Sequence, residues 1–273
     1  MSIKKAFIYY CIVSFFFPLF ILFKIFSLNN NYSEIVEFES LISPKVSKGG
    51  RWIGQGFVRQ SLPILILAGH ADSQGLSGSG TLGEYVALKK GKPMDSSMSD
   101  ELFWNLKLSK TIVQIGKRYG LNISFYDPLE REIRDPNNLK TNWSVGAKHS
   151  LKGGYALEIH FDSYGKYGIG SGLIPPISKN LNTVDEAIAR NFGRFPILYR
   201  GGLGASRRQI RILEVGKLEG YLEKNLRDQN TRQKTLDIIA KRIVKSMMIG
   251  LNQKAGFNPL PDRGDIFLPA IYL

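Results

Sequence analysis

The sequence predicts an α/β fold, with a mixed, mostly parallel sheet flanked by helices and preceded by one N-terminal transmembrane helix. First, short apolar runs typical of buried strands alternate along the chain with longer segments of helical periodicity. Second, two of the three histidines, His70 and His160, stand at the ends of such runs. Third, residues 6–23 contain no charge. Because open α/β sheets bind ligands at the carboxyl ends of their strands, the two histidines indicate where a site would form.

The N-terminal stretch predicts a membrane-spanning helix. As an α-helix, residues 6–23 rise about 27 Å, close to the thickness of the hydrocarbon core. Lys4 and Lys5 precede the stretch, which predicts a cytoplasmic N-terminus and places the rest of the chain across the membrane. We assign residues 1–28 to a membrane anchor or signal sequence and favour an uncleaved anchor, because no small-x-small cleavage site follows. Cys11, the only cysteine, lies inside the stretch, so the exported part has no disulfide and no cysteine metal ligand.

Three regions follow this segment. Residues 29–61 are polar and punctuated by Asn, Ser and Gly, which is typical of a juxtamembrane linker. Residues 62–252 carry the alternating strand and helix patterns and form the predicted folded domain. Residues 253–273 are rich in Pro and Gly and are predicted to be an irregular C-terminal tail.

Within the domain, strands and helices are predicted in turn. Ser99 is the expected N-cap of a helix whose apolar residues lie broadly on one face. His149, at the end of the next predicted helix, is interpreted as a helix-end surface residue. The apolar stripe of the last helix predicts a core helix. In chain order, the expected elements are a strand at 63–68, a Gly/Ser-rich loop at 75–83, a helix at 99–119, a strand at 122–126, a helix at 138–149, a strand at 155–161, a short apolar piece at 170–174, a strand at 209–215 and a helix at 231–251.

The two strand-end histidines suggest a metal site. Two histidines and one carboxylate are a recurrent set of catalytic zinc ligands. Glu101 and Glu84 both lie between the histidines in sequence, and Glu101 would equally suit the first turn of a helix, where the macrodipole favours negative charge. Glu214 stands in an apolar run, where a carboxylate is costly to bury unless it is paired or used in chemistry. These residues alone leave the third ligand open.

Four short motifs resemble a known family, the zinc-dependent N-acetylmuramoyl-L-alanine amidases of the Amidase_3 type. The motifs are ILILAGH at 64–70, ELFWNL at 101–106, ALEIHFD at 156–162 and ILEVG at 212–216, and they stand in the family's order. The resemblance implies that His70, Glu101 and His160 hold Zn²⁺ and that Glu214 is the catalytic carboxylate. It also implies an enzyme that hydrolyses the amide between N-acetylmuramic acid and L-alanine of peptidoglycan. The chain departs from the family pattern directly after His70 and His160 and at Lys217.

With the N-terminal segment, the resemblance predicts a single-pass protein of the bacterial inner membrane whose catalytic domain lies on the periplasmic or extracytoplasmic side. Peptidoglycan and the membrane, through the N-terminal helix, are the expected partners; the sequence identifies no regulatory protein. Two other functions stay open: another zinc amidohydrolase or peptidase acting on a small acylated amino acid, and a catalytically silent wall-binding module.

The charge favours an anionic partner. Lys and Arg number 37 against 23 acidic residues, a formal net charge of +14. Arg207, Arg208 and Arg211 cluster in sequence beside glycines, where they could contact phosphates, but no nucleic-acid motif accompanies them. With an export segment, we therefore expect no nucleic-acid partner. The chain also lacks a complete Gly-x-Gly-x-x-Gly and a Gly-x-Ser-x-Gly, the signatures of dinucleotide binding and of common serine hydrolases.

Overall fold

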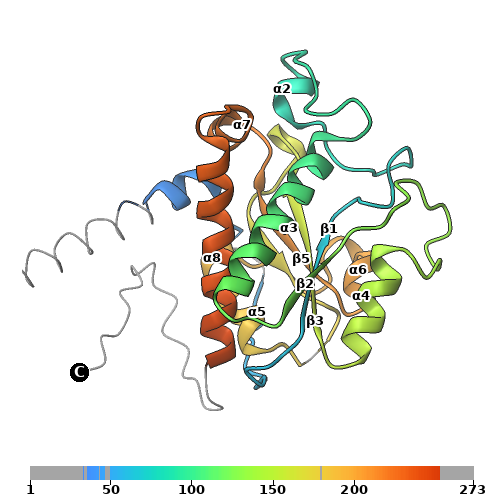
Figure 1. Cartoon of the computed structure of the whole chain (residues 1–273), viewed down its shortest axis with the longest axis vertical. Coiled ribbons are helices and arrows are strands. Elements are labelled where there is room, and N and C mark those ends of the chain that lie inside the picture. Colours follow the sequence, from blue (N-terminus) through green and yellow to red (C-terminus); the bar gives the residue numbers. More distant parts are fainter. Residues whose placement is uncertain (1–32, 34–35, 43, 47–49, 179, 253–273) are drawn as a thin grey trace, which may run out of the picture.

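The computed structural model describes residues 33, 36–42, 44–46, 50–178 and 180–252. Its centre is a five-stranded sheet in the order β2-β1-β3-β5-β4 (Figure 1). The described strands are β1 (Ile64–Ala68), β2 (Ile123–Tyr126), β3 (Tyr155–Asp162), β4 (Gly172–Ile174) and β5 (Arg211–Lys217). Strands β2, β1, β3 and β5 are parallel, and β4 pairs antiparallel with β5. The predicted mixed, mostly parallel sheet is therefore confirmed.

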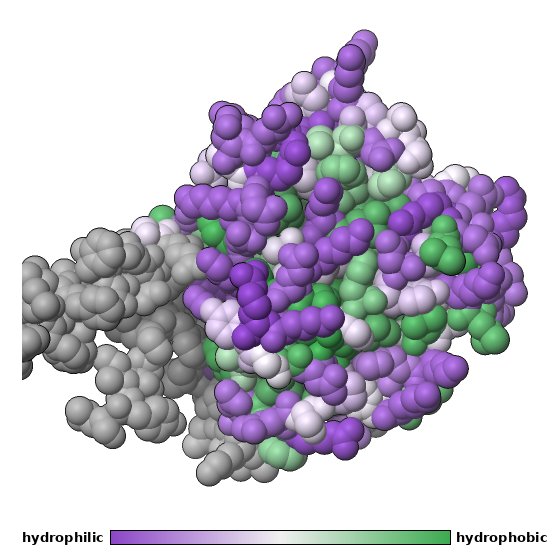
Figure 2. All heavy atoms as spheres, in the orientation of Figure 1, coloured by the Kyte–Doolittle hydropathy of each residue, from purple (hydrophilic) through white to green (hydrophobic). Residues whose placement is uncertain are grey.

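Helices cover both faces of the sheet. On one face α3 packs on β1, β2 and β3 and is itself packed against α8; on the other, α4 packs on β1 and β3 (Figure 1). The surface seen in Figure 2 is mostly hydrophilic, with hydrophobic side chains showing between the charged ones. The described helices are α2 (Gly83–Ala87), α3 (Asp100–Arg118), α4 (Asn142–Leu151), α5 (Thr183–Phe192), α6 (Gly204–Arg207), α7 (Gly220–Arg227) and α8 (Arg232–Asn252), with 3-10 turns at Gly165–Tyr167 and Tyr199–Gly201.

The double covering explains why β1 is an uninterrupted apolar run. Every residue of β1 is buried, because a central parallel strand meets helices on both faces. Ile64 and Ile66 belong to the larger core under α3 and α8, whereas Leu65 and Leu67 belong to a smaller core under α4 and α6. The alternation of side chains along a strand thus divides one run between two cores.

Capping side chains determine where several of the helices begin. The Ser99 side chain accepts a hydrogen bond from Leu102 N at 3.3 Å, as expected for the cap of α3. The helix predicted at 138–149 begins only at Asn142, because Thr141 caps it by accepting a bond from Ser144 N. Helices α2, α5, α6 and α7 were not predicted. For α5 the signal was present in the sequence: Asn182 and Asp185 form a capping box.

The described part of residues 29–61 differs from the predicted linker. Residues 36–42 are helical, and Phe38, Leu41, Ile42 and Trp52 are buried in the main core. Trp52 Nε1 donates a 2.7 Å hydrogen bond to Phe195 O. The prediction was wrong because the Asn, Ser and Gly residues dominate the composition, whereas the few apolar side chains between them decide the packing. The folded domain therefore begins before residue 62.

This packing predicts that Phe38→Ala destabilises the domain. The Phe38 ring is fully buried and meets Phe192 edge-on at 5.2 Å between centroids. Loss of a buried aromatic ring leaves a cavity and is expected to cost about 3–5 kcal/mol of unfolding free energy, measured by denaturant titration of the full-length chain. The control is Phe57→Ala in the same segment, because Phe57 is 61% exposed. Equal effects of the two substitutions would contradict the packed arrangement.

Two predicted regions lie outside the described residues: the membrane anchor at residues 1–28 and the tail at 253–273. In the part of the chain that the structure describes, none of the helices has the length and apolar character needed to cross a membrane.

Candidate metal centre

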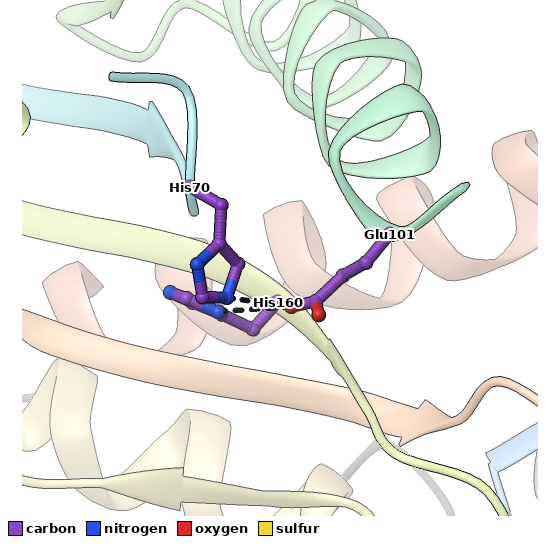
Figure 3. Close-up of side chains that lie close together, drawn as sticks. All are labelled: His70, Glu101 and His160. Atoms are coloured by element: carbon purple, nitrogen blue, oxygen red, sulfur yellow. Dashed lines mark hydrogen bonds and ion pairs between the residues drawn. The ribbon is translucent and has the colours of Figure 1, made fainter. Parts of the chain in front are cut away.

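Three side chains from separate elements meet at the carboxyl edge of the sheet. His70 follows β1, His160 lies in β3 and Glu101 occupies the first turn of α3; Figure 3 shows the three pointing toward one another. Glu101 Oε1 lies 3.3 Å from His70 Nε2 and 3.1 Å from His160 Nδ1. The two imidazole rings meet edge-to-face, with 4.7 Å between their centroids. The predicted ligand set is therefore brought together.

The donor set fits zinc. One donor atom from each residue can be chosen so that all lie within 4.8 Å of one another. Bonds of about 2.0–2.1 Å in a tetrahedron separate neighbouring ligand atoms by roughly 3.3 Å, which agrees with the two distances to Glu101 Oε1. The set contains no sulfur, and two imidazoles with one carboxylate leave a fourth position free for water. The group therefore has the composition to hold a metal ion, and its two distances to Glu101 Oε1 match ligand spacing around zinc.

The loop after β1 is held against the start of α3. His70 has a φ of +63°, an uncommon conformation for a residue with a side chain. Gln74 Nε2 donates to His70 O at 3.0 Å, and Gln74 Oε1 accepts from Ser99 N at 2.8 Å. Asn105 Nδ2 donates to Gly69 O at 3.1 Å. These bonds join the histidine loop to the helix that carries the glutamate, and they give Asn105 a structural role.

Gly69 and Thr81 set the distances inside the group. A Cβ at position 69 would lie 2.3 Å from the His160 ring, so only glycine lets the two strand ends approach this closely. Thr81 N donates to Glu101 Oε2 at 2.8 Å, which leaves Oε1 facing the histidines. Glycine is therefore required before His70 because the His160 ring occupies the space that a side chain at position 69 would need.

The electrostatics of the group favour a bound cation. Burial alone would raise the pKa of Glu101, but His70 and His160 hold it below its ordinary value. Burial opposes a charge on His160, yet the hydrogen bond to Glu101 and the negative charges of Glu158 and Glu214 raise its pKa well above the usual range. The carboxylates stabilise positive charge at this point, whether it is carried by protons or by a metal ion.

Glu214 lies beside this group. It is the register partner of His160 on the neighbouring parallel strand β5, so both side chains leave the sheet on the same face. Glu214 Oε2 is buried without a hydrogen-bond partner. Burial raises the pKa of Glu214 to about 8, with the negative charges of Glu101 and Asp162 adding to the rise and His160 opposing it. A carboxyl group poised near neutrality suits proton transfer.

We expect Glu214→Gln to stabilise the metal-free protein at alkaline pH. The folded-state pKa of about 8 exceeds the ordinary 4.5. The favourable contribution of protonated Glu214 is therefore complete below pH 4.5 and disappears as the pH rises to 8, above which the ionised carboxylate is buried. Gln does not titrate, so the variant should gain about 2–4 kcal/mol relative to the parent between these limits. Urea unfolding with chelator at pH 5 and pH 9 measures the difference, and an equal difference at both pH values would refute it.

Glu158 also lies beside His160, although the sequence assigned it no role. Glu158 is 3% exposed, and its Oε2 lies 3.5 Å from His160 Nε2. It is two residues before His160 on β3 and therefore faces the same side of the sheet. The signal that identified Glu214, a carboxylate in an apolar run, is equally present at Glu158.

Several other candidates lie elsewhere. Glu84 pairs with Lys89 at 3.0 Å and accepts from Gly220 N, so it is not the third ligand of this group. His149 Nε2 lies 3.0 Å from Pro63 O, beside the start of β1 and at the opposite end of that strand from His70. The metal site is therefore formed by His70, His160 and Glu101, without Glu84 or His149.

The three arginines near the glycines do not form the anion site that their sequence suggested. Arg211 is buried and paired with Asp185 at 2.8 Å. Arg207 donates to the carbonyl oxygens of Gly202 and Gly201. Arg208 donates to Gly204 O and lies over the Trp143 ring. Their positive charges support local structure.

No family model matches the chain, and no curated protein matches it in sequence. Solved structures do match. The catalytic domain of CwlV, an N-acetylmuramoyl-L-alanine amidase from Bacillus (Paenibacillus) polymyxa var. colistinus, is 13% identical, with a TM-score of 0.45, 68% of this chain covered and 96% of that chain. Cwp6 from Clostridium difficile is 12% identical, with a TM-score of 0.47, and the match covers 70% of this chain and 29% of Cwp6.

A third similar structure is the CwlD amidase from Clostridioides difficile in complex with the GerS lipoprotein. It is 13% identical, with a TM-score of 0.41, and the match covers 69% of this chain and 96% of that one. At these identities and TM-scores, the likeness assigns neither an activity nor a site residue to this chain. The function is therefore argued from the side chains of the site.

Proposed function

We propose that this chain is a zinc-dependent N-acetylmuramoyl-L-alanine amidase, which hydrolyses the amide between N-acetylmuramic acid and L-alanine of peptidoglycan. The observation that carries the proposal is the convergence of His70 Nε2, His160 Nδ1 and Glu101 Oε1, with Glu214 beside them in register. Three donors and a separate buried carboxylate are the parts that metal-assisted amide hydrolysis requires.

His70, Glu101 and His160 would hold the metal. When bound, a zinc ion supplies Lewis-acid activation of water and of the amide carbonyl. Glu214 takes a proton from the attacking water as the new C–O bond forms. It then delivers that proton to the leaving nitrogen as the C–N bond breaks, so the carboxylate is regenerated. In the metal-free protein burial raises the pKa of Glu214 to about 8; a cation held by His70, Glu101 and His160 would favour the ionised carboxylate that this role requires.

The four motifs that resemble the amidase family support peptidoglycan as the substrate. The net charge of +14 also suits a wall whose stem peptides carry carboxylates. We further propose that residues 1–28 anchor the chain in the bacterial inner membrane, with the site on the extracytoplasmic side where peptidoglycan lies. Sequencing of the mature N-terminus from host membranes tests the anchor: a start beyond Leu28 would show that the segment is removed.

The decisive experiment is mass spectrometry of purified peptidoglycan after incubation with the full-length chain in mild detergent, with zinc and with chelator. The proposal expects zinc-dependent release of intact stem peptides that begin at L-alanine. Zinc-dependent cleavage of small acylated amino acids without release of stem peptides would instead identify another zinc amidohydrolase. Bound zinc and sedimentation of the chain with peptidoglycan, without cleavage of either substrate, would identify a silent wall-binding module, and both results would overturn the proposal.

A further inference from the structure

We infer that Glu158 is a positioning residue that orients the His160 ring so that Nδ1, and not Nε2, faces the metal. The inference rests on the proposed metal site. The two nitrogens of His160 lie between two carboxylates: Nδ1 is 3.1 Å from Glu101 Oε1, and Nε2 is 3.5 Å from Glu158 Oε2. A histidine that ligates a metal usually directs its other ring nitrogen to a carboxylate or carbonyl, which fixes the tautomer and the ring orientation.

His160 has no other partner on the Nε2 side. Nε2 is buried and makes no hydrogen bond of good geometry, so the carboxylate that faces it is the group available to accept its proton. The same ring lies so close to Gly69 that a Cβ at position 69 would be 2.3 Å from it. Glu158 thus decides which nitrogen carries the proton, while the absence of a side chain at position 69 leaves room for the ring in this place.

Glu158 is itself held in place. Asn142 Nδ2 donates to Glu158 Oε1 at 3.2 Å and to Ala68 O at 2.6 Å. The backbone N–H of Asn142 donates to Asp72 Oδ2 at 2.7 Å. Asn142 is the first residue of α4, where the helix dipole favours negative charge. This chain of contacts links the end of β1, which precedes His70, to the carboxylate behind His160.

The partners of Glu158 argue against a purely structural ion pair. Apart from Glu101, which belongs to the metal site, the other carboxylate residues that are buried among the described residues pair with arginine: Asp185 with Arg211, Glu186 with Arg190 and Arg194, and Asp100 and Glu223 with Arg227. Glu158 makes no such pair among the described residues: its ion-pair contact there is with His160, and His70 is the other cationic group that acts on it. Its negative charge is therefore directed at the metal group, where it strengthens cation binding through the imidazole.

The test is the zinc affinity of Glu158→Gln in the full-length chain, measured by competition with a chromophoric chelator. Gln keeps the shape of the side chain and an acceptor for Asn142 but loses the charge. We expect zinc to bind about 10–100-fold more weakly. The matched control is Glu186→Gln, a buried glutamate paired with arginines, which should leave zinc affinity unchanged. An affinity of the Glu158 variant within twofold of the parent would overturn the inference.

A second measurement needs no variant. The chain has three histidines, so ¹⁵N-histidine labelling with ¹¹³Cd in place of zinc resolves each ring. We expect cadmium coupling at Nδ1 of His160 and Nε2 of His70; coupling at Nε2 of His160 would overturn the inference.

The amidase proposal and the Glu158 inference can fail independently of each other. Weakened metal binding in Glu158→Gln without any amide hydrolysis by the parent would sustain the inference and refute the amidase, whereas a parent that binds no zinc would refute both.

Discussion

Glu214→Gln should slow amide hydrolysis by orders of magnitude while zinc stays bound. Gln is nearly isosteric but cannot accept the proton of the attacking water, and loss of a general base typically lowers the rate by about 10²–10⁴-fold. Zinc should remain because the three donors His70, Glu101 and His160 are untouched. The buried Oε2 of Glu214 has no hydrogen-bond partner whose loss would disturb the fold. The substitution therefore separates chemistry from metal binding.

The measurements are the rate of stem-peptide release from peptidoglycan and the zinc content by elemental analysis. Glu186→Gln serves as the control, because it neutralises a buried glutamate of α5 that is paired with arginines outside the metal group. If the Glu214 variant kept a rate within a few-fold of the parent, Glu214 would have no part in proton transfer. If it lost zinc as well, the carboxylate would act in the metal site itself.

His70→Ala should remove both zinc and activity. Only two donors of the group would remain, too few for a catalytic zinc site, which uses three protein ligands. The loss of affinity should exceed the roughly 10–100-fold typical of removing an outer-shell partner. Added zinc at high concentration should not restore hydrolysis to the parent rate, because the remaining ligands no longer position the ion against Glu214.

Zinc stoichiometry after dialysis, together with stem-peptide release, measures this effect. His149→Ala is the matched control, since His149 lies near Pro63 at the far end of β1 and should retain full zinc content. Unchanged zinc in the His70 variant would remove His70 from the ligand set. The contact between His70 and Glu101 would then not belong to a shared metal site.

The sheet was predictable wherever burial is continuous. Strand β1 is apolar along its whole length because helices cover both faces, and this pattern is visible in the sequence. The antiparallel pairing of β4 with β5 and the packing of Phe38 into the core were not predictable in the same way. Both depend on contacts between segments far apart in the chain, for which the local composition carries little signal.

By itself, the sequence determined the α/β class, the two strand-end histidines and a short set of candidate carboxylates, since periodicity and strand ends are local properties. The tertiary structure decided which of these groups meet. It brought Glu101 rather than Glu84 to the histidines, placed Glu158 behind His160, and directed the charge of Arg211 to Asp185. The physical reason is that the register of parallel strands and the docking of α3 set distances of a few ångströms between residues dozens of positions apart, and charge and hydrogen bonding depend on those distances.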